Sequence, residues 1–170
     1  FDEKGKMICT IYKGFFPELT KEQAATLAVF PEITDKDWSR GPKDATLTIL
    51  EYSDFQCPAC LGFYTELEKL LAKYPDDVRL VFRNFPLISI HPNSKVAAQA
   101  AEAAGLQDKY WEMYEALFSK QVDWSGLGAE DLLSWLKTEA GTLGLNSEKF
   151  ASDLTSDVIV NKVNSEMDYA

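Results

Sequence analysis

Residues 46–60 read Thr-Leu-Thr-Ile-Leu-Glu-Tyr-Ser-Asp-Phe-Gln-Cys-Pro-Ala-Cys, and this stretch decides the fold. Its first part, Thr46–Tyr52, is rich in β-branched and apolar side chains, as in a strand that is buried on both faces. In Pro58–Tyr74 the apolar side chains recur every three or four residues, which predicts a helix. Val78–Phe85 has strand character again. A strand, a helix and a second strand in close succession indicate a βαβ unit with parallel strands and a right-handed crossover.

The pattern downstream of this unit is helical and does not return to a strand. We expect four helices, at Asn93–Ala104 with Gly105 as its C-cap, Asp108–Ser119, Ala129–Ala140 and Ser147–Asp168. Aromatic side chains recur at helical spacing in the second of them, which favours packing between helices over a peptide-binding surface. The predicted fold class is α/β, with a helical insertion or cap at about residues 92–145.

Residues 1–40 are interpreted as an N-terminal extension, and residues 41–170 as the main domain. Within the extension, Met7–Tyr12 has the composition of a short strand. Thr20–Phe30 resembles a helix with a polar first turn, which the following proline stops. Trp38–Asp44 contains glycine and proline and is predicted to be a turn-rich approach to the first strand.

The composition excludes several classes of protein. The chain has 170 residues, of which 46% are hydrophobic and 26% charged, so it can bury a core and is not a disordered chain. Its formal charge of −10 argues against nucleic acid as a partner, because phosphate binding needs a basic surface. Three cysteines are too few for a disulfide scaffold. Since the chain begins at Phe1 rather than Met, we expect a signal peptide or anchor to have preceded it.

The pair Cys57 and Cys60 stands where the buried strand gives way to the helix. Cys57 falls at the helix N-terminus, where unpaired N–H groups and the helix dipole stabilise a thiolate. Pro58 suits the first helical turn, where its missing N–H costs nothing. Cys60 lies one turn further on, along the apolar stripe and within disulfide reach of Cys57. One sulfur can therefore attack a substrate while the other resolves the mixed disulfide.

Acidic residues near this pair have two interpretations each. Glu51 interrupts an apolar strand, so burial should raise its pKa and let it exchange protons with Cys60; alternatively it reaches solvent at the strand end. Asp54, which precedes Phe55 in the loop before the pair, is either a turn residue only or a negative charge that opposes the thiolate.

Other roles for the cysteines stay open at this point. Cys9, Cys57, Cys60 and His91 could together form a zinc site, although they are widely spaced. The pair could also be an inert structural disulfide in a module that only binds a partner. His91 is expected to be a surface or capping residue. Cys9 is either a small buried side chain or a free thiol available for an intermolecular disulfide.

Several segments together resemble the DsbA-like thiol–disulfide oxidoreductases of the thioredoxin superfamily. They are Gly41–Ala45, the run Thr48–Cys60, Arg83–Leu87 with the sequence Arg-Asn-Phe-Pro-Leu, and His91-Pro92 before an alanine-rich helix. The resemblance covers about residues 38–170 and is more specific than a CxxC motif alone.

This resemblance implies a thioredoxin-like fold with an inserted helical subdomain and thiol–disulfide exchange without a cofactor or metal. It implies that Cys57 is the nucleophile and Cys60 the resolving cysteine, supported by Pro58 and Ala59. The implied partners are protein thiol or disulfide substrates and a redox recycling partner such as a membrane quinone-linked oxidase. The implied location is extracytoplasmic, in the periplasm or at the outer face of the cytoplasmic membrane, with membrane attachment through a segment upstream. Because Pro58-Ala59 offers no cation to the thiolate, we expect a couple less oxidising than the strongest family members.

One feature of the family has no counterpart in this chain. Thioredoxin-like enzymes place a cis-proline loop against the cysteine pair, and in the DsbA-like pattern that loop follows the helical insertion. Here no proline lies beyond Pro92. We therefore expect the C-terminal part of the fold to be missing from this chain.

Overall fold

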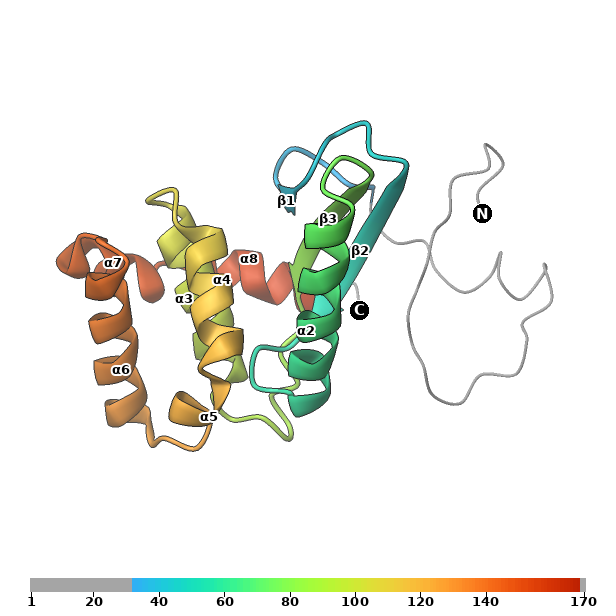
Figure 1. The fold of residues 1–170 in the computed structure, drawn as a ribbon. Coiled ribbons are helices and arrows are strands. Elements are labelled where there is room, and N and C mark those ends of the chain that lie inside the picture. Colours follow the sequence, from blue (N-terminus) through green and yellow to red (C-terminus); the bar gives the residue numbers. More distant parts are fainter. Residues whose placement is uncertain (1–31, 169–170) are drawn as a thin grey trace.

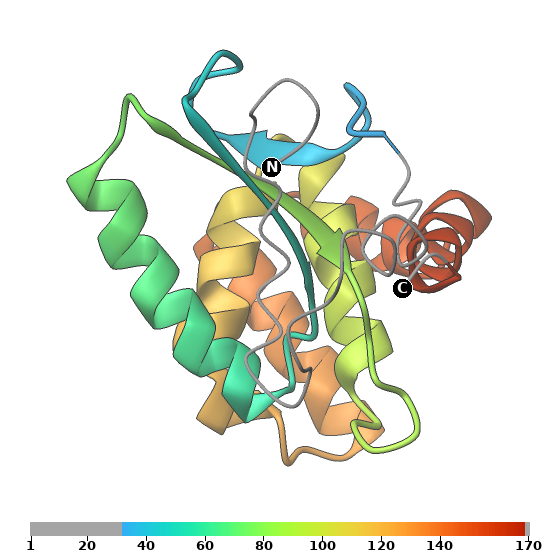
Figure 2. The same ribbon diagram turned by 90° about the vertical axis from the view of Figure 1, so that its right-hand side faces the viewer.

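The structure is a computed structural model that describes residues 32–168. The predictions for Met7–Tyr12, Thr20–Phe30 and Cys9 lie outside the described residues. Within residues 32–168 the chain forms a three-stranded sheet and seven helices (Figures 1 and 2). No helix in this part of the chain is both long and apolar enough to cross a membrane.

The predicted βαβ unit is confirmed. It consists of strand β2 (Leu47–Ser53), helix α2 (Pro58–Lys73) and strand β3 (Val78–Asn84). The two strands are parallel and are paired over their whole length, from Leu47 with Val78 to Ser53 with Asn84. Their carboxyl ends therefore lie side by side, and helix α2 begins shortly after β2 ends. That arrangement places the cysteine pair at the carboxyl end of the sheet, where open α/β sheets bind ligands.

A third strand, β1 (Trp38–Arg40), pairs antiparallel with β3 and gives the sheet order β1-β3-β2. The sequence interpretation of Trp38–Asp44 as turn-rich was therefore wrong in its first three residues. The turn itself begins at Gly41, whose φ of 91° favours glycine. A Cβ atom on Gly41 would lie 2.3 Å from the carbonyl oxygen of Val78, so the close approach of the two backbones also excludes a side chain.

Six helices follow β3. They are α3 (Ser94–Gly105), α4 (Tyr110–Ser119), α5 (Gln121–Trp124), α6 (Ala129–Thr142), α7 (Ser147–Leu154) and α8 (Asp157–Met167). Figure 1 shows α3 and α4 between the sheet and the α6–α7 pair, and α4 also packs against α2. Helix α8 returns to the sheet and contacts α3 and β3.

Two differences between the predicted and the observed helices have a clear physical cause. Gly105 is the last residue of α3 rather than its C-cap, and it is needed because Trp38 packs on it: a Cβ atom would lie 2.3 Å from Cζ2 of the indole. The predicted single helix Ser147–Asp168 is two helices, α7 and α8, with the break at Thr155 and Ser156. Hydroxyl side chains compete for backbone hydrogen bonds and favour such breaks.

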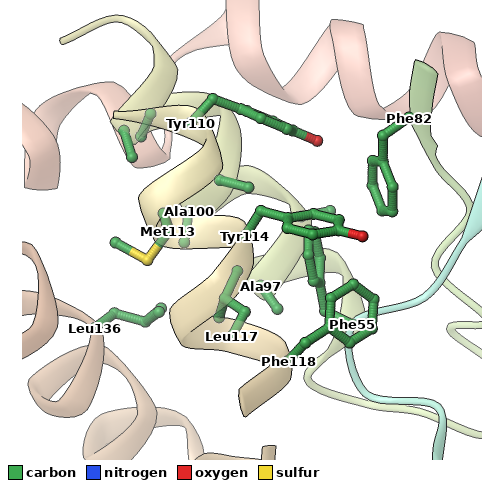
Figure 3. Close-up of a cluster of buried hydrophobic side chains, with 14 of the residues drawn as sticks. Phe55, Phe82, Ala97, Ala100, Tyr110, Met113, Tyr114, Leu117, Phe118 and Leu136 are labelled. Atoms are coloured by element: carbon green, nitrogen blue, oxygen red, sulfur yellow. The ribbon is translucent and has the colours of Figure 1, made fainter. Parts of the chain in front are cut away.

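The aromatic side chains of α4 form the centre of the core, as their spacing predicts. Tyr110, Tyr114 and Phe118 are buried and meet Phe82 of β3 and Phe55 of the loop before α2 (Figure 3). Such ring pairs add about 0.5–1.5 kcal/mol each beyond their buried area. The loop that carries the cysteines is thus fixed to the helical layer by one buried ring.

Candidate functional site: the cysteine pair at the start of α2

Cys57 is the N-cap of helix α2, with extended backbone angles (φ −75°, ψ 122°), and Pro58 is the first helical residue. No side chain caps this helix end, and its first turn contains no acidic residue. The Cys57 sulfur is therefore the side-chain group best placed to interact with the partial positive charge of the unpaired backbone N–H groups at the start of the helix. The side chain is half-buried, while Pro58 and Ala59 beside it are exposed. A partner molecule can reach this end of the helix.

Cys60 lies in the first turn of α2, and both cysteines are free thiols. Burial, the largest cause, raises the pKa of the Cys60 thiol to about 11. The Ser53 hydroxyl and the Asp54 backbone N–H lower it, whereas the contact with the Cys57 sulfur raises it further. Both side chains are half-buried, so exposure does not distinguish the two sulfurs, and the difference between them lies in their contacts. Cys60 stays a protonated thiol at neutral pH.

Glu51 lies on β2 with 6% of its surface exposed, so the interpretation that it reaches solvent was wrong. Neither carboxylate oxygen has a hydrogen-bond partner among the described residues. Burial raises the pKa of Glu51 to about 7, as the sequence predicted, while Ser53 and the Arg40 charge act weakly in the opposite direction. The carboxyl group can therefore take up or release a proton near neutral pH.

Ser53 connects these two groups and was missed in the sequence. It lies two residues beyond Glu51 on β2, and alternate residues of a strand share one face. Its buried hydroxyl lowers the pKa of both Glu51 and Cys60, although no well-formed hydrogen bond reaches the Glu51 oxygens. The alternation along the strand was the signal that could have identified it. Ser53 stands between the proton on Cys60 and a carboxyl group that can accept it.

Asp54 is more than a turn residue, because its buried carboxylate also contacts the loop after β3. It is 2% exposed, and its Oδ1 accepts the Gln56 N–H at 2.7 Å. Its Oδ2 accepts the Leu87 N–H at 2.8 Å and lies 2.7 Å from Nδ1 of His91. The expectation that His91 is a surface or capping residue was wrong, because its ring is half-buried against this carboxylate.

Two glutamines that the sequence did not indicate hold the loop before Cys57. Buried Gln121 of α5 donates to the carbonyl oxygens of Phe55 (2.7 Å) and Cys57 (3.1 Å). Gln56 donates to the Ser125 carbonyl and accepts the N–H of Asn93 at the start of α3. These contacts join segments far apart in the chain, so no spacing pattern could reveal them. Figure 1 shows α5 and the β3–α3 connection at the same end of the molecule as the start of α2.

The sequence left a zinc site open as an alternative. Within residues 32–168, no three His, Cys, Asp or Glu side chains lie close enough together to hold a metal ion. Cys9, one of the four candidate ligands, lies outside the described part of the chain.

Comparisons with known proteins agree with this geometry. A family model described as Thioredoxin matches residues 34–170. A thioredoxin-like oxidoreductase from Silicibacter pomeroyi DSS-3 is 26% identical, with a TM-score of 0.64 over 79% of this chain and 72% of that chain. BdbD from Bacillus subtilis is 25% identical, with a TM-score of 0.66 over 77% of this chain and 72% of that chain. The chain belongs to the thioredoxin superfamily, among its DsbA-like members.

Curated relatives carry a different name. The chain is 39% identical over 124 residues to the Na(+)/H(+) antiporter NhaA 1 of Salinispora arenicola, which covers 73% of this chain and 18% of that protein. It is 37% identical over 139 residues to the antiporter NhaA of Herminiimonas arsenicoxydans, covering 82% of this chain and 20% of that protein. The chain thus spans about a fifth of the length of these relatives.

Proposed function

We propose that this protein is a thiol–disulfide oxidoreductase that exchanges disulfides with protein substrates through Cys57 and Cys60, in oxidative protein folding. The observation that carries the proposal is the contrast between the two sulfurs. Cys57 is the N-cap residue of a helix whose first N–H groups bind no capping side chain. Cys60 keeps its proton because burial raises the pKa of its thiol to about 11. A pair of this kind can form and release a mixed disulfide.

The proposed exchange proceeds in two steps, here in the oxidising direction. A substrate thiolate attacks the Cys57 sulfur, a substrate–Cys57 disulfide forms, and the Cys57–Cys60 bond breaks. Cys60 leaves with the electron pair and takes up a proton. A second substrate thiolate then attacks the substrate sulfur of the mixed disulfide and releases Cys57 as a thiolate. The substrate loses two electrons and the protein gains them; in reverse, the same steps reduce a substrate disulfide.

Glu51 supplies or accepts the Cys60 proton in this proposal. Its pKa of about 7 suits proton transfer near neutral pH, and Ser53 lies next to both groups. A buried carboxyl group without hydrogen-bond partners is costly for folding. Its presence beside a thiol of raised pKa supports a role in turnover.

The surroundings of Cys57 support a polypeptide substrate. Three exposed aliphatic side chains lie in the segments that flank the pair: Ile88 (54% exposed), Ile90 (68%) and Val122 (83%). Leu87 is hydrogen-bonded to Asp54 and Gln121 to Cys57, so both segments are fixed beside the site. Exposed apolar side chains beside the pair, on a protein of charge −10, suit unfolded segments whose cysteines have apolar neighbours.

The location and the recycling partner are part of the same proposal. We place the protein outside the cytoplasm, where disulfides persist, at or near the outer face of the cytoplasmic membrane. Relatives whose names describe antiporters support a position beside a membrane. A membrane quinone-linked oxidase would restore the Cys57–Cys60 disulfide by accepting its two electrons.

The test is turnover of a peptide dithiol and of a model protein disulfide by the purified chain, with the redox potential of the pair measured against glutathione. Wild-type protein should show turnover, and Cys57→Ser should show none. The potential assigns the direction of the reaction. If the wild-type pair exchanged with neither substrate nor glutathione, the chain would instead be a binding module with an inert pair.

A further inference from the structure

The Asp54 carboxylate is the most fully bonded group near the cysteines. It accepts two backbone N–H groups, from Gln56 (2.7 Å) and Leu87 (2.8 Å), and faces Nδ1 of His91 at 2.7 Å. A carboxylate only accepts, so Nδ1 of the ring is the donor. The contact joins the loop before α2 to the loop after β3 across 37 positions of sequence. The proton transfers proposed above make no use of this pair.

Asp54 also touches both cysteines through its backbone. Its carbonyl oxygen accepts the Cys57 N–H at 3.1 Å, and its own N–H is hydrogen-bonded to the Cys60 sulfur. The backbone of Asp54 therefore helps to hold both cysteines in position. The residue acts through these contacts, which makes it a positioning residue.

His91 sets the net charge of this buried position. The two side chains expose 1% (Asp54) and 16% (His91) of their surface, and within residues 32–168 the ion pairs of Asp54 involve His91 alone. With a neutral imidazole the pair carries one negative charge; with an imidazolium it carries none. A negative charge near Cys57 disfavours its thiolate, and neutralising that charge favours it.

At the ends of the elements that meet here, the other titratable residues are Glu51 on β2, Cys57 and Cys60 at the start of α2, Lys95 in the first turn of α3 and Asp123 on α5. None of them forms an ion pair with Asp54 or His91 in the described part of the chain. His91 is the only histidine of the protein, so no other imidazole can change the charge at this site.

We propose that the Asp54–His91 pair positions the cysteine loop and couples the redox state of Cys57 and Cys60 to the protonation of His91. The inference rests on the proposed disulfide exchange and names a regulator of the same site. Reduction by two glutathione thiols breaks the Cys57–Cys60 bond, forms glutathione disulfide, and leaves a proton on Cys60 and a thiolate at Cys57. A second proton, bound by His91, stabilises that thiolate without forming a bond to it.

The test compares the glutathione redox equilibrium of wild type, His91→Gln and Asp54→Asn between about pH 5 and pH 8, with Ser89→Ala in the same loop as control. At the acidic end His91→Gln should make the reduced form less stable by about tenfold in the equilibrium constant, because Asp54 stays charged. At the alkaline end Asp54→Asn should make it more stable by a similar factor. Ser89→Ala should follow wild type. Shifts of both variants in the same direction, or profiles parallel to wild type, would overturn the coupling.

The single histidine gives a second readout that needs no variant. Linkage requires that the His91 ring titrate at higher pH in the reduced than in the oxidised protein, which NMR of its resonances measures directly. Equal midpoints would refute the inference. Turnover of protein substrates tests the proposed function separately. Turnover together with equal His91 midpoints would reject only the role of the Asp54–His91 pair. Unequal His91 midpoints without turnover would support that role and reject protein substrates.

Discussion

Two regions of the molecule contain buried glutamate side chains with different surroundings. Beside the cysteines, both oxygens of Glu51 lack a hydrogen-bond partner in the described structure. At the end of β3, Glu102 accepts from Trp38 Nε1 (2.8 Å) and Asn84 Nδ2 (2.9 Å) and pairs with Lys162 (2.8 Å). Glu166 of α8 accepts from the backbone N–H (2.8 Å) and the side-chain amide (2.7 Å) of Asn84.

Asn84, Glu102 and Glu166 form a structural cluster, whereas the surroundings of Glu51 give it no structural role. Burial raises the pKa of both Glu51 and Glu166 to about 7, and for Glu166 the nearby Glu102 charge adds to the effect. The region at β3 offsets the cost with donors and so holds α8 and α3 against the sheet. Beside Cys60, no donor offsets the free-energy cost of burying the Glu51 carboxyl group. We expect such a cost to persist where the carboxyl group takes part in the reaction. An elevated pKa alone would not have distinguished the two regions.

The sharpest test of the cysteine region is the trapping of mixed disulfides. Cys60→Ser should still attack a substrate disulfide and should accumulate the covalent complex, because nothing resolves it. Cys57→Ser should form no complex at all. Non-reducing electrophoresis with mass spectrometry reads both. Equal trapping by the two variants would reverse or abolish the assigned roles.

In the structural cluster the largest effect is expected on stability. Asn84→Ala removes the amide that serves both carboxylates and should lower the free energy of unfolding by about 3 kcal/mol. Turnover per folded molecule should stay at the wild-type level. Denaturant unfolding measures the first and activity at low denaturant the second. Exposed Asn161→Ala is the control; a loss of stability equal to that of the control would remove the structural role.

Glu51→Leu should have the opposite signature. Removing an unpaired buried carboxyl group should raise stability by about 1–2 kcal/mol, while turnover falls about tenfold because the Cys60 proton loses its acceptor. Unfolding and turnover assays on the same preparation measure the two effects. A variant that is equally stable and equally active would return Glu51 to the status of an ordinary strand residue.

The last effect is on the pH dependence of stability. The pKa of Glu51 rises from an ordinary 4.5 to about 7 in the folded protein, so between these pH values the unfolded chain is the more ionised state. The contribution of this group is fully present below about pH 4.5 and is lost as pH rises toward 7, by up to about 1.4 kcal/mol per unit. Glu51→Leu should flatten this slope in thermal unfolding. An unchanged slope would mean that Glu51 does not titrate there.

The sequence predicted the parts that depend on local patterns. Cys57 and Cys60 are marked by their spacing at a strand–helix junction, and Glu51 by a charge within an apolar strand. The pairing of Asp54 with His91 and the anchoring by Gln121 could not be predicted, because the fold brings together residues 37 and more positions apart. Strand β1 was missed because three residues are too few to show a strand pattern. The strand forms through its hydrogen bonds with β3, which the sequence does not reveal.

The central claim is that the two sulfurs differ in reactivity, and alkylation mapped by mass spectrometry tests it most directly. The reduced protein is treated briefly with iodoacetamide at a series of pH values, and the modified cysteines are identified in peptides. Cys57, at the start of the helix, should be modified first, and Cys60 should follow only as the pH approaches about 11, where its thiol ionises. Equal rates at the two cysteines near neutral pH, or faster modification of Cys60, would contradict the account.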